Sequence, residues 1–414
     1  MPEQREPRSH DAVAGQAGTV VFDLARARRE TPGCEQVLHF NNAGASLMPQ
    51  VVLDTMIAHL ELEARIGGYE SADRVQDRLN GVYASAARLL GCDSDEIAIV
   101  ENATHAWDMA FYAIPLGPGD RILTANAEYG SNYIAFLQRA RQTGAVVEAI
   151  PNDEHGQLSI AALERMMDER VEVVAITHVP TNGGLVNPAA AVGKVAREAG
   201  ALYLLDACQS VGQMDVNVSA IGCDMLSATG RKYLRGPRGI GFLYVRREVV
   251  DRLEPPLLDL HAAEWVAADR FVIRPGAKRF ENWESNVAAK LGLGAAIDYA
   301  LGWGLDTIRA RVTALATLLR ARLSDIAGVS VHDLGVERCG IVSLTLEGHE
   351  PDAVRAALAR ERINVTVSRA SATRLDMDAR HLPAVVRASV HYYNSEEEVD
   401  RFCAAVGALA AAHD

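Results

Sequence analysis

The 414-residue sequence contains few lysines, cysteines and aromatic residues, and it has no long apolar run. No stretch of 18 apolar residues occurs, so we expect no membrane-spanning helix. Residues 1–16 are polar and include no apolar core segment, so we expect no secretory signal. The six cysteines are too sparse in a chain of this length for a disulfide scaffold, and they form no Cys-x-x-Cys pair, which argues against a zinc ribbon and a thioredoxin-like site. We therefore expect a reduced, cytoplasmic protein without a metal site.

The charge balance excludes several classes of partner. Lys and Arg number 41 against 54 Asp and Glu, which gives a formal net charge of −13. Such an acidic chain is not built to hold nucleic acid or an anionic membrane surface. Hydrophobic residues make up 49% of the chain, so a disordered chain is excluded and a large core can form. The length corresponds to about two or three domains.

Lysine is the scarcest charged residue. Arginine takes nearly every basic position, and the lysines are only Lys194, Lys232, Lys278 and Lys290. Unlike arginine, a desolvated lysine can lose its proton and act as a nucleophilic amine. A biased composition also leaves few lysines, so this observation only ranks the four as candidates.

Short apolar runs alternate with helical patterns over the first three quarters of the chain. We expect strands at 97–100, 121–125, 146–150, 171–177, 202–206, 225–228 and 241–245. Helices are expected near 104–114, 131–142, 158–168 and 188–199. Alternation of helices with continuous apolar strands predicts an α/β fold with a mostly parallel sheet.

The pattern changes after residue 304. Helices are expected at 287–303, 305–326, 351–360 and 395–412, and strands at 341–346, 365–368 and 387–392. We interpret this as a smaller α+β domain at 305–414, a large domain at 46–304, and an N-terminal arm at 1–45 that joins the small domain.

Polar residues follow several of the expected strands, and ligands of open α/β sheets bind at these strand ends. Asn102 or Thr104 is placed to cap a helix, whose free N–H groups favour an anion, although plain capping explains them equally well. Asp206 ends an apolar run, where an acid is costly to bury without a cationic partner.

A glycine-rich segment at 227–241 combines Thr229, Arg231 and Lys232 with the sequence GPRGIG. It fits neither the phosphate-binding loop with GK[ST] nor the G-x-G-x-x-G dinucleotide fingerprint. An amine beside side chains that can bind a phosphate suits a Schiff base to a phosphorylated aldehyde, with Lys232 as the nucleophile.

The ordered set D-A-x-Q (Asp206 to Gln209) and T-G-R-K-x-x-x-G-P-x-G-x-G (from Thr229) resembles the class V aminotransferase family of pyridoxal phosphate (PLP) enzymes. That family includes cysteine desulfurases, selenocysteine lyases and isopenicillin N epimerase-like proteins. The resemblance runs from about residue 38 to 410. It implies a fold-type I transferase, in which a large domain with a mostly parallel seven-stranded sheet flanked by helices joins a smaller α+β domain, with PLP as the cofactor.

The resemblance also implies roles for the cofactor residues. Lys232 matches the lysine that forms the Schiff base and moves the Cα proton, and Asp206 matches the acid that pairs with the ring nitrogen. Gln209 contacts the phenolic oxygen, with Thr181 beside it. Tyr129 lies where an aromatic ring covers the pyridine face. The phosphate-cup positions are Ala103, Thr104, Thr229 and Arg231, with His105 and Ser285 as further candidates.

For the substrate, Arg387 matches the arginine that clamps the carboxylate, and Asn42 lies on a loop that approaches the same group. Alternatives remain open: Tyr129 as an ordinary loop aromatic, and Arg387 in a structural ion pair. A hydrogen-bonded structural role is also open for His105, His178 and His391. The family's sites are completed across a dimer, so we expect a homodimer, an amino-acid substrate, and no nucleic acid or membrane partner.

The sequence departs from the family in three places. The stretch 368–381 lacks the nucleophilic cysteine of desulfurases, and nothing marks Cys208 as a persulfide carrier. Arg231 stands where histidine is usual. Glu284 occupies the position of a partner threonine that holds the phosphate, so either Ser285 replaces it or Glu284 turns toward substrate. Arg369 and Arg374 are candidates to bind a distal anionic group of the substrate. The alternative is that both are ordinary solvated side chains at the surface.

We therefore favour β-elimination, a C–S lyase reaction on cysteine or an S-substituted cysteine without a persulfide cysteine. Transamination and epimerisation remain alternatives, because all three follow loss of the Cα proton. A binding protein that has lost catalysis and a nucleotide-dependent dehydrogenase are weaker interpretations.

Overall fold

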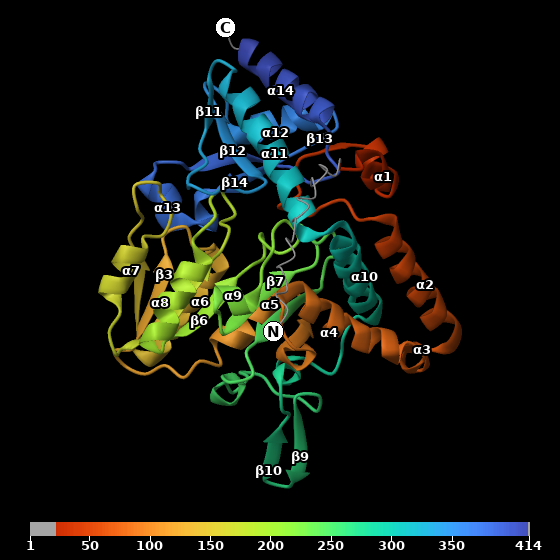
Figure 1. Cartoon of the computed structure of the whole chain (residues 1–414), viewed down its shortest axis with the longest axis vertical. Coiled ribbons are helices and arrows are strands. Elements are labelled where there is room, and N and C mark those ends of the chain that lie inside the picture. The colour runs from red at the N-terminus through yellow and green to blue at the C-terminus, as the bar shows by residue number, and fades with distance from the viewer. Residues whose placement is uncertain (1–21, 413–414) are drawn as a thin grey trace, which may run out of the picture.

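The computed structural model describes residues 22–412, and a seven-stranded sheet forms its centre (Figure 1). The strand order is β2 (Ile97–Val100), β8 (Gly241–Val245), β7 (Met225–Thr229), β6 (Leu202–Asp206), β5 (Val171–Thr177), β3 (Arg121–Ala125) and β4 (Val146–Ile150). Strand β8 runs antiparallel to both neighbours, and the other four pairings are parallel. The predicted mostly parallel α/β sheet is confirmed.

Successive residues of the central strands face two separate cores. In β6, Leu202 and Leu204 pack with helices α5 (Ala103–Phe111) and α6 (Gly130–Thr143). Tyr203 and Leu205 pack on the opposite face, whose cover includes α8 (Ala189–Ala199). Both faces are therefore apolar, which explains the continuous Val, Ile and Leu runs in the sequence.

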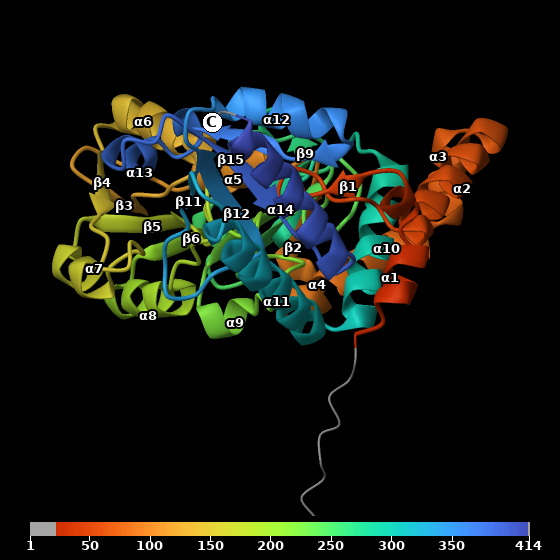
Figure 2. The same cartoon turned by 90° about the horizontal axis from the view of Figure 1, so that it is seen from above.

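Further helices complete the cover of the sheet. They are α4 (Gln76–Leu90), α7 (Ile160–Met166), α9 (Val218–Ile221) and α10 (Val287–Trp303). Helices α2 (Gln50–Ile66) and α3 (Gly68–Arg74) extend from one side of the molecule, and α2 lies against α10 (Figures 1 and 2). None of the helices in residues 22–412 is long and apolar enough to cross a membrane.

The C-terminal part forms a second, four-stranded sheet in the order β11 (Val329–Val331), β12 (Ile341–Leu346), β15 (Ala384–Ser389) and β14 (Thr366–Arg369). Its helices are α11 (Leu305–Ser324), α12 (Pro351–Arg360), α13 (Arg374–Ala379) and α14 (Glu396–Ala411). Helix α1 (Leu24–Arg29) precedes β1 (Leu38–His39), which pairs in parallel with β13 (Ile363–Asn364). The exact domain boundaries stay predictions.

Two local predictions are corrected. The strand predicted at 387–392 spans Ala384–Ser389, because residues 391–394 form a turn closed by the Asn394 N–H and the carbonyl oxygen of His391 at 2.9 Å. The antiparallel hairpin of β9 (Ala263–Ala267) and β10 (Arg270–Ile273) was not predicted. It projects from the body of the molecule, so its side chains lack the buried pattern that revealed the other strands (Figure 1).

Candidate active site

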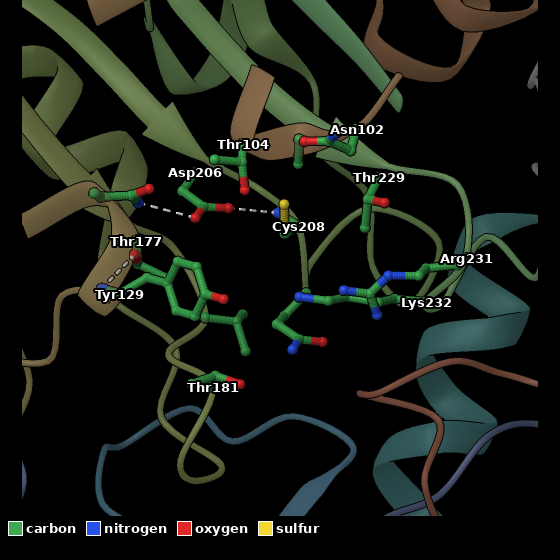
Figure 3. A pocket seen from close by; sticks show the side chains of 14 residues that line it. Asn102, Thr104, Tyr129, Thr177, Thr181, Asp206, Cys208, Thr229, Arg231 and Lys232 are labelled. Carbon is green, nitrogen blue, oxygen red and sulfur yellow. Dashed lines mark hydrogen bonds between the residues drawn. The ribbon is translucent and has the colours of Figure 1, made fainter. Parts of the chain in front are cut away.

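A cavity of about 230 Å³ lies at the carboxyl ends of β5, β6 and β7 (Figure 3). It is lined by Asn102, Ala103, Thr104, Tyr129, Asn132, Thr177, Val179, Thr181, Asp206, Cys208, Gln209, Thr229, Arg231 and Lys232. The sequence predicted nine of these residues from separate segments of the chain, and the fold brings them to one place at the predicted edge of the sheet.

Lys232 reaches this cavity from a tight loop that follows β7. The loop is closed by a hydrogen bond of 2.7 Å from the Gly236 N–H to the carbonyl oxygen of Gly230. It packs directly on the backbone of Gly212, whose φ is +94° and where a Cβ would lie only 2.4 Å from the carbonyl carbon of Tyr233. Desolvation lowers the pKa of the Lys232 amine, which favours the neutral, nucleophilic form.

Asp206 is the last residue of β6, and only 5% of its surface is exposed. Its carboxylate accepts hydrogen bonds from the Asn132 side-chain amide at 3.0 Å and from the Cys208 N–H at 2.9 Å. No salt bridge to this carboxylate occurs within residues 22–412. The site therefore presents a buried acid to which a cationic group of a ligand could bind.

The N-terminus of α5 forms the opposite wall of the cavity. The side chain of Asn102 caps the helix by accepting a hydrogen bond of 2.9 Å from the His105 N–H. Strand β8 passes so close that a Cβ on Gly241 would lie 3.1 Å from the Ala103 nitrogen. Together with the hydroxyls of Thr104 and Thr229 and the guanidinium of Arg231, this helix end provides donors for a phosphate.

Gln209 and Tyr129 complete the cavity around its centre. The Gln209 side-chain nitrogen donates to the carbonyl oxygen of Ala43 at 3.0 Å, and its buried Oε1 has no hydrogen-bond partner. The Tyr129 ring projects toward the middle of the pocket, opposite Lys232 (Figure 3). Two side chains from different segments are thus free to contact a flat ligand.

Arg387 lies behind the lining residues and contacts the pocket through Thr181. Its side chain is 6% exposed, and its Nε has no hydrogen-bond partner. Desolvation lowers the pKa of the Arg387 guanidinium to about 10. A buried guanidinium without a carboxylate partner fits a site for an incoming carboxylate.

Comparison with known proteins identifies the architecture. Residues 38–402 match the family model described as aminotransferase class-V. The chain belongs to this family of PLP-dependent enzymes. It is 30% identical over 407 residues to a cysteine desulfurase of Synechococcus elongatus, covering 95% of this chain and 64% of that relative. It is also 30% identical to a probable cysteine desulfurase of Methanothermobacter thermautotrophicus, covering 90% of this chain and 94% of the relative.

A solved structure agrees with this assignment. The apo cysteine desulfurase of Thermococcus onnurineus NA1 superimposes with a TM-score of 0.87 at 28% identity, covering 94% of this chain and 98% of that one. The predicted fold-type I architecture is confirmed.

Several predicted site residues of this class-V chain lie outside the cavity. His105 pairs its ring with the carboxylate of Glu101. Asn42 is fully buried, and its side chain contacts the carbonyl oxygen of Ser389 and the hydroxyl of Tyr393. Their proposed contacts with cofactor or substrate remain predictions. For Asn42, such a contact would have to replace hydrogen bonds that the side chain already makes.

The remaining candidates lie at the surface or in structural contacts. Glu284 is exposed and Ser285 is partly exposed, and neither lines the cavity of this single chain. The surface arginines Arg369 and Arg374 form ion pairs with Asp352 and Asp378. His391 bridges the Tyr233 carbonyl oxygen and the Tyr392 N–H, which is a structural role.

Sequence reasoning missed Asn132, Thr177 and Val179 as lining residues, named Asn102 only as a helix cap, and mentioned Cys208 only in rejecting a persulfide carrier. Asn132 could have been predicted from the sequence, because it lies three positions after Tyr129 on a helix whose first turn faces the same strand ends. Thr177 ends β5 as Asp206 ends β6, and the two residues pair in register.

Proposed function

We propose that this class-V chain binds PLP through Lys232 and catalyses β-elimination from cysteine or an S-substituted cysteine. The observation that carries the proposal is that the Lys232 amine and the buried Asp206 carboxylate face one cavity whose far wall is a helix N-terminus. These groups suit the aldehyde, the ring nitrogen and the phosphate of PLP, respectively. In residues 22–412, no salt bridge competes with the ring nitrogen for Asp206.

Each residue then has a definite task. When bound, the cofactor withdraws electrons from Cα of the amino acid attached to it. The Lys232 amine, whose pKa is lowered by desolvation, accepts the Cα proton. Asp206 keeps the ring nitrogen protonated, and Arg387 binds the substrate carboxylate. For an S-substituted cysteine, the overall reaction consumes one water and yields pyruvate, ammonia and the thiol.

The state of the six cysteines favours this reaction over persulfide formation. Desolvation raises the pKa of Cys34 and Cys403 to about 11, and of Cys92 and Cys339 to about 12, and it also raises the pKa of the buried Cys223. Desolvation also raises the pKa of the half-buried Cys208, which lines the cavity, well above its usual value. A neutral thiol is a poor nucleophile, so we expect sulfur to leave with the product rather than on the protein.

We also propose that the site is completed by a second copy of the chain. The hairpin of β9 and β10 exposes Trp265 (70%) and Phe271 (52%), and α2 exposes Ile57 and Leu60. Exposed apolar side chains gathered on two projecting elements are typical of an interface between subunits. Ser285 lies outside the cavity of its own chain, so its contact with a phosphate requires a partner subunit.

The test combines one chemical and one catalytic measurement. Protein produced with ample vitamin B6 is reduced with borohydride, and mass spectrometry locates the adduct, which we expect on Lys232. The same protein is then incubated with cysteine and S-substituted cysteines while all products are analysed. Pyruvate, ammonia and thiol in equal amounts support β-elimination, whereas conversion of an added keto acid into an amino acid replaces it with transamination. A change of stereochemistry at Cα without other products replaces it with epimerisation.

A further inference from the structure

Glu128 is a buried acid beside the cavity that the proposed mechanism does not use. It lies between β3 and α6, and 2% of its surface is exposed. Its Oε1 accepts hydrogen bonds from the Tyr129 N–H at 3.0 Å, the Asn132 amide at 2.8 Å and the Thr177 hydroxyl at 2.6 Å. Its Oε2 accepts from the Thr177 N–H at 2.9 Å and the Thr124 hydroxyl at 3.1 Å. Five donors therefore surround one carboxylate.

Asn132 connects this carboxylate to Asp206. The same side-chain nitrogen donates to Glu128 Oε1 and, at 3.0 Å, to Asp206 Oδ2. An amide nitrogen carries two hydrogens, so each hydrogen serves one carboxylate. If the Asn132 amide turned over, its oxygen would face both acids. Glu128 thus fixes which end of Asn132 is presented to Asp206.

Both side-chain oxygens of Glu128 have to act as hydrogen-bond acceptors. Each oxygen receives a backbone N–H, from Tyr129 on one side and Thr177 on the other. A glutamine would place its NH₂ group against one of these N–H groups in either orientation, which leaves buried donors unsatisfied.

We propose that Glu128 is a positioning residue for the cofactor ring, acting through two of its neighbours. Through Asn132 it orients the Asp206 carboxylate toward the place of the ring nitrogen, and through the Tyr129 backbone it holds the aromatic ring that covers the pyridine face. This inference rests on the proposed PLP function and names a residue that the family motif did not assign.

The electrostatics agree with this geometry. Burial and the neighbouring Asp206 charge raise the pKa of Glu128 to about 7, and the hydrogen bonds from Thr177 and Asn132 act in the opposite direction. Tyr203 is a further titratable group close to it. In its ionised form, the Glu128 carboxylate adds negative potential where the ring nitrogen would carry its proton.

The decisive test follows the ring nitrogen itself. The full-length holoprotein is loaded with PLP labelled with ¹⁵N at the ring nitrogen, and the ¹⁵N chemical shift is measured at neutral pH. We expect the protonated shift in the wild type and a displacement toward the unprotonated shift in Glu128→Gln. We also expect Glu128→Gln to bind PLP about tenfold more weakly, because hydrogen bonds to a charged group are lost. Glu281→Gln is the matched control, because Glu281 is a buried carboxylate that accepts the Ile99 N–H outside the cavity.

A second variant covers the case in which Glu128→Gln does not fold. Asn132→Ala keeps Glu128 and removes only the bridge to Asp206, so it should displace the ¹⁵N shift in the same direction. Wild-type shifts in both folded variants, or in Asn132→Ala alone if Glu128→Gln is unfolded, overturn the inference. A wild-type protein without a borohydride adduct on Lys232 overturns the proposed function as well, which separates the two failures.

Discussion

Arg387 on β15 donates two hydrogen bonds from one guanidinium nitrogen to Thr181, at 2.9 Å to its carbonyl oxygen and 2.6 Å to its hydroxyl. Thr181 lines the cavity, so this contact joins the C-terminal sheet to the loop that follows β5. Within residues 22–412, the guanidinium is held by neutral oxygens and its buried Nε has no hydrogen-bond partner.

Replacement of Arg387 by glutamine is therefore expected to weaken substrate binding more than it weakens the fold. Loss of charge-assisted hydrogen bonds to a carboxylate should raise KM about 10- to 100-fold. The free energy of unfolding of the apoprotein should stay equal or rise, because a desolvated cation is removed. Steady-state kinetics and urea unfolding measure the two effects, with Arg387→Lys as the charge-conserving control. A large loss of stability with unchanged KM would identify Arg387 as purely structural.

We expect the ring of Tyr129 to strengthen PLP binding through its contact area, and we expect its hydroxyl to contribute little. Tyr129→Phe should bind PLP within about twofold of the wild type, whereas Tyr129→Ala should bind it about 3- to 10-fold more weakly, as loss of an aromatic stack implies. Titration of apoprotein with PLP, followed by absorbance, gives both affinities. If the Phe variant binds as weakly as the Ala variant, the hydroxyl carries the interaction.

The sequence predicts the structure best where an apolar run marks a strand and a polar residue follows that strand. All seven strands of the central sheet follow from apolar runs, and the residues after those runs pointed to Asp206 and Lys232. The roles of Thr104, Thr181 and Thr229 came from the family resemblance, and Thr177 was missed. The hairpin of β9 and β10 could not be predicted, because its exposed residues carry no buried face. In the bridge from Glu128 through Asn132 to Asp206, Asn132 and Asp206 are 74 positions apart, so only the folded chain reveals their contact.

Acid should destabilise the protein through His178. Burial lowers the pKa of its ring from 6.5 to about 4, so the neutral form is favoured in the folded state. The lowered pKa contributes to the free energy of unfolding fully above pH 6.5. This contribution is lost as the pH falls through 4, by about 3 kcal/mol in total. Urea unfolding at pH 7 and pH 4.5 should show a smaller loss for His178→Asn than for the wild type. The exposed His155→Asn is the matched control, and equal losses in all three proteins would contradict the prediction.

Cys208→Ser should retain C–S lyase activity within about threefold, because the thiol is neutral and no step uses it. Pyruvate release from an S-substituted cysteine measures the rate. Detection of a persulfide on Cys208 by mass spectrometry, together with an inactive serine variant, would favour a desulfurase mechanism instead.

The projecting hairpin should control assembly. The double substitution Trp265→Ser and Phe271→Ser removes two large exposed apolar side chains without touching a buried core. We expect a homodimer in the wild type and a shift toward monomer in the variant, measured by sedimentation velocity over a range of concentrations. A double substitution of Leu257 and Val336, which are equally exposed apolar residues elsewhere, is the control.

The parallel pairing of β1 with β13 has a consequence for how the chain is made. Leu38 leaves the ribosome 325 residues ahead of its partner Ile363. At a synthesis rate of about 5–20 residues per second, the first strand waits roughly 15–65 s before that partner exists. The backbone groups of β1 that pair with β13 therefore have to wait for almost the whole chain, so this contact between the two ends forms late in synthesis.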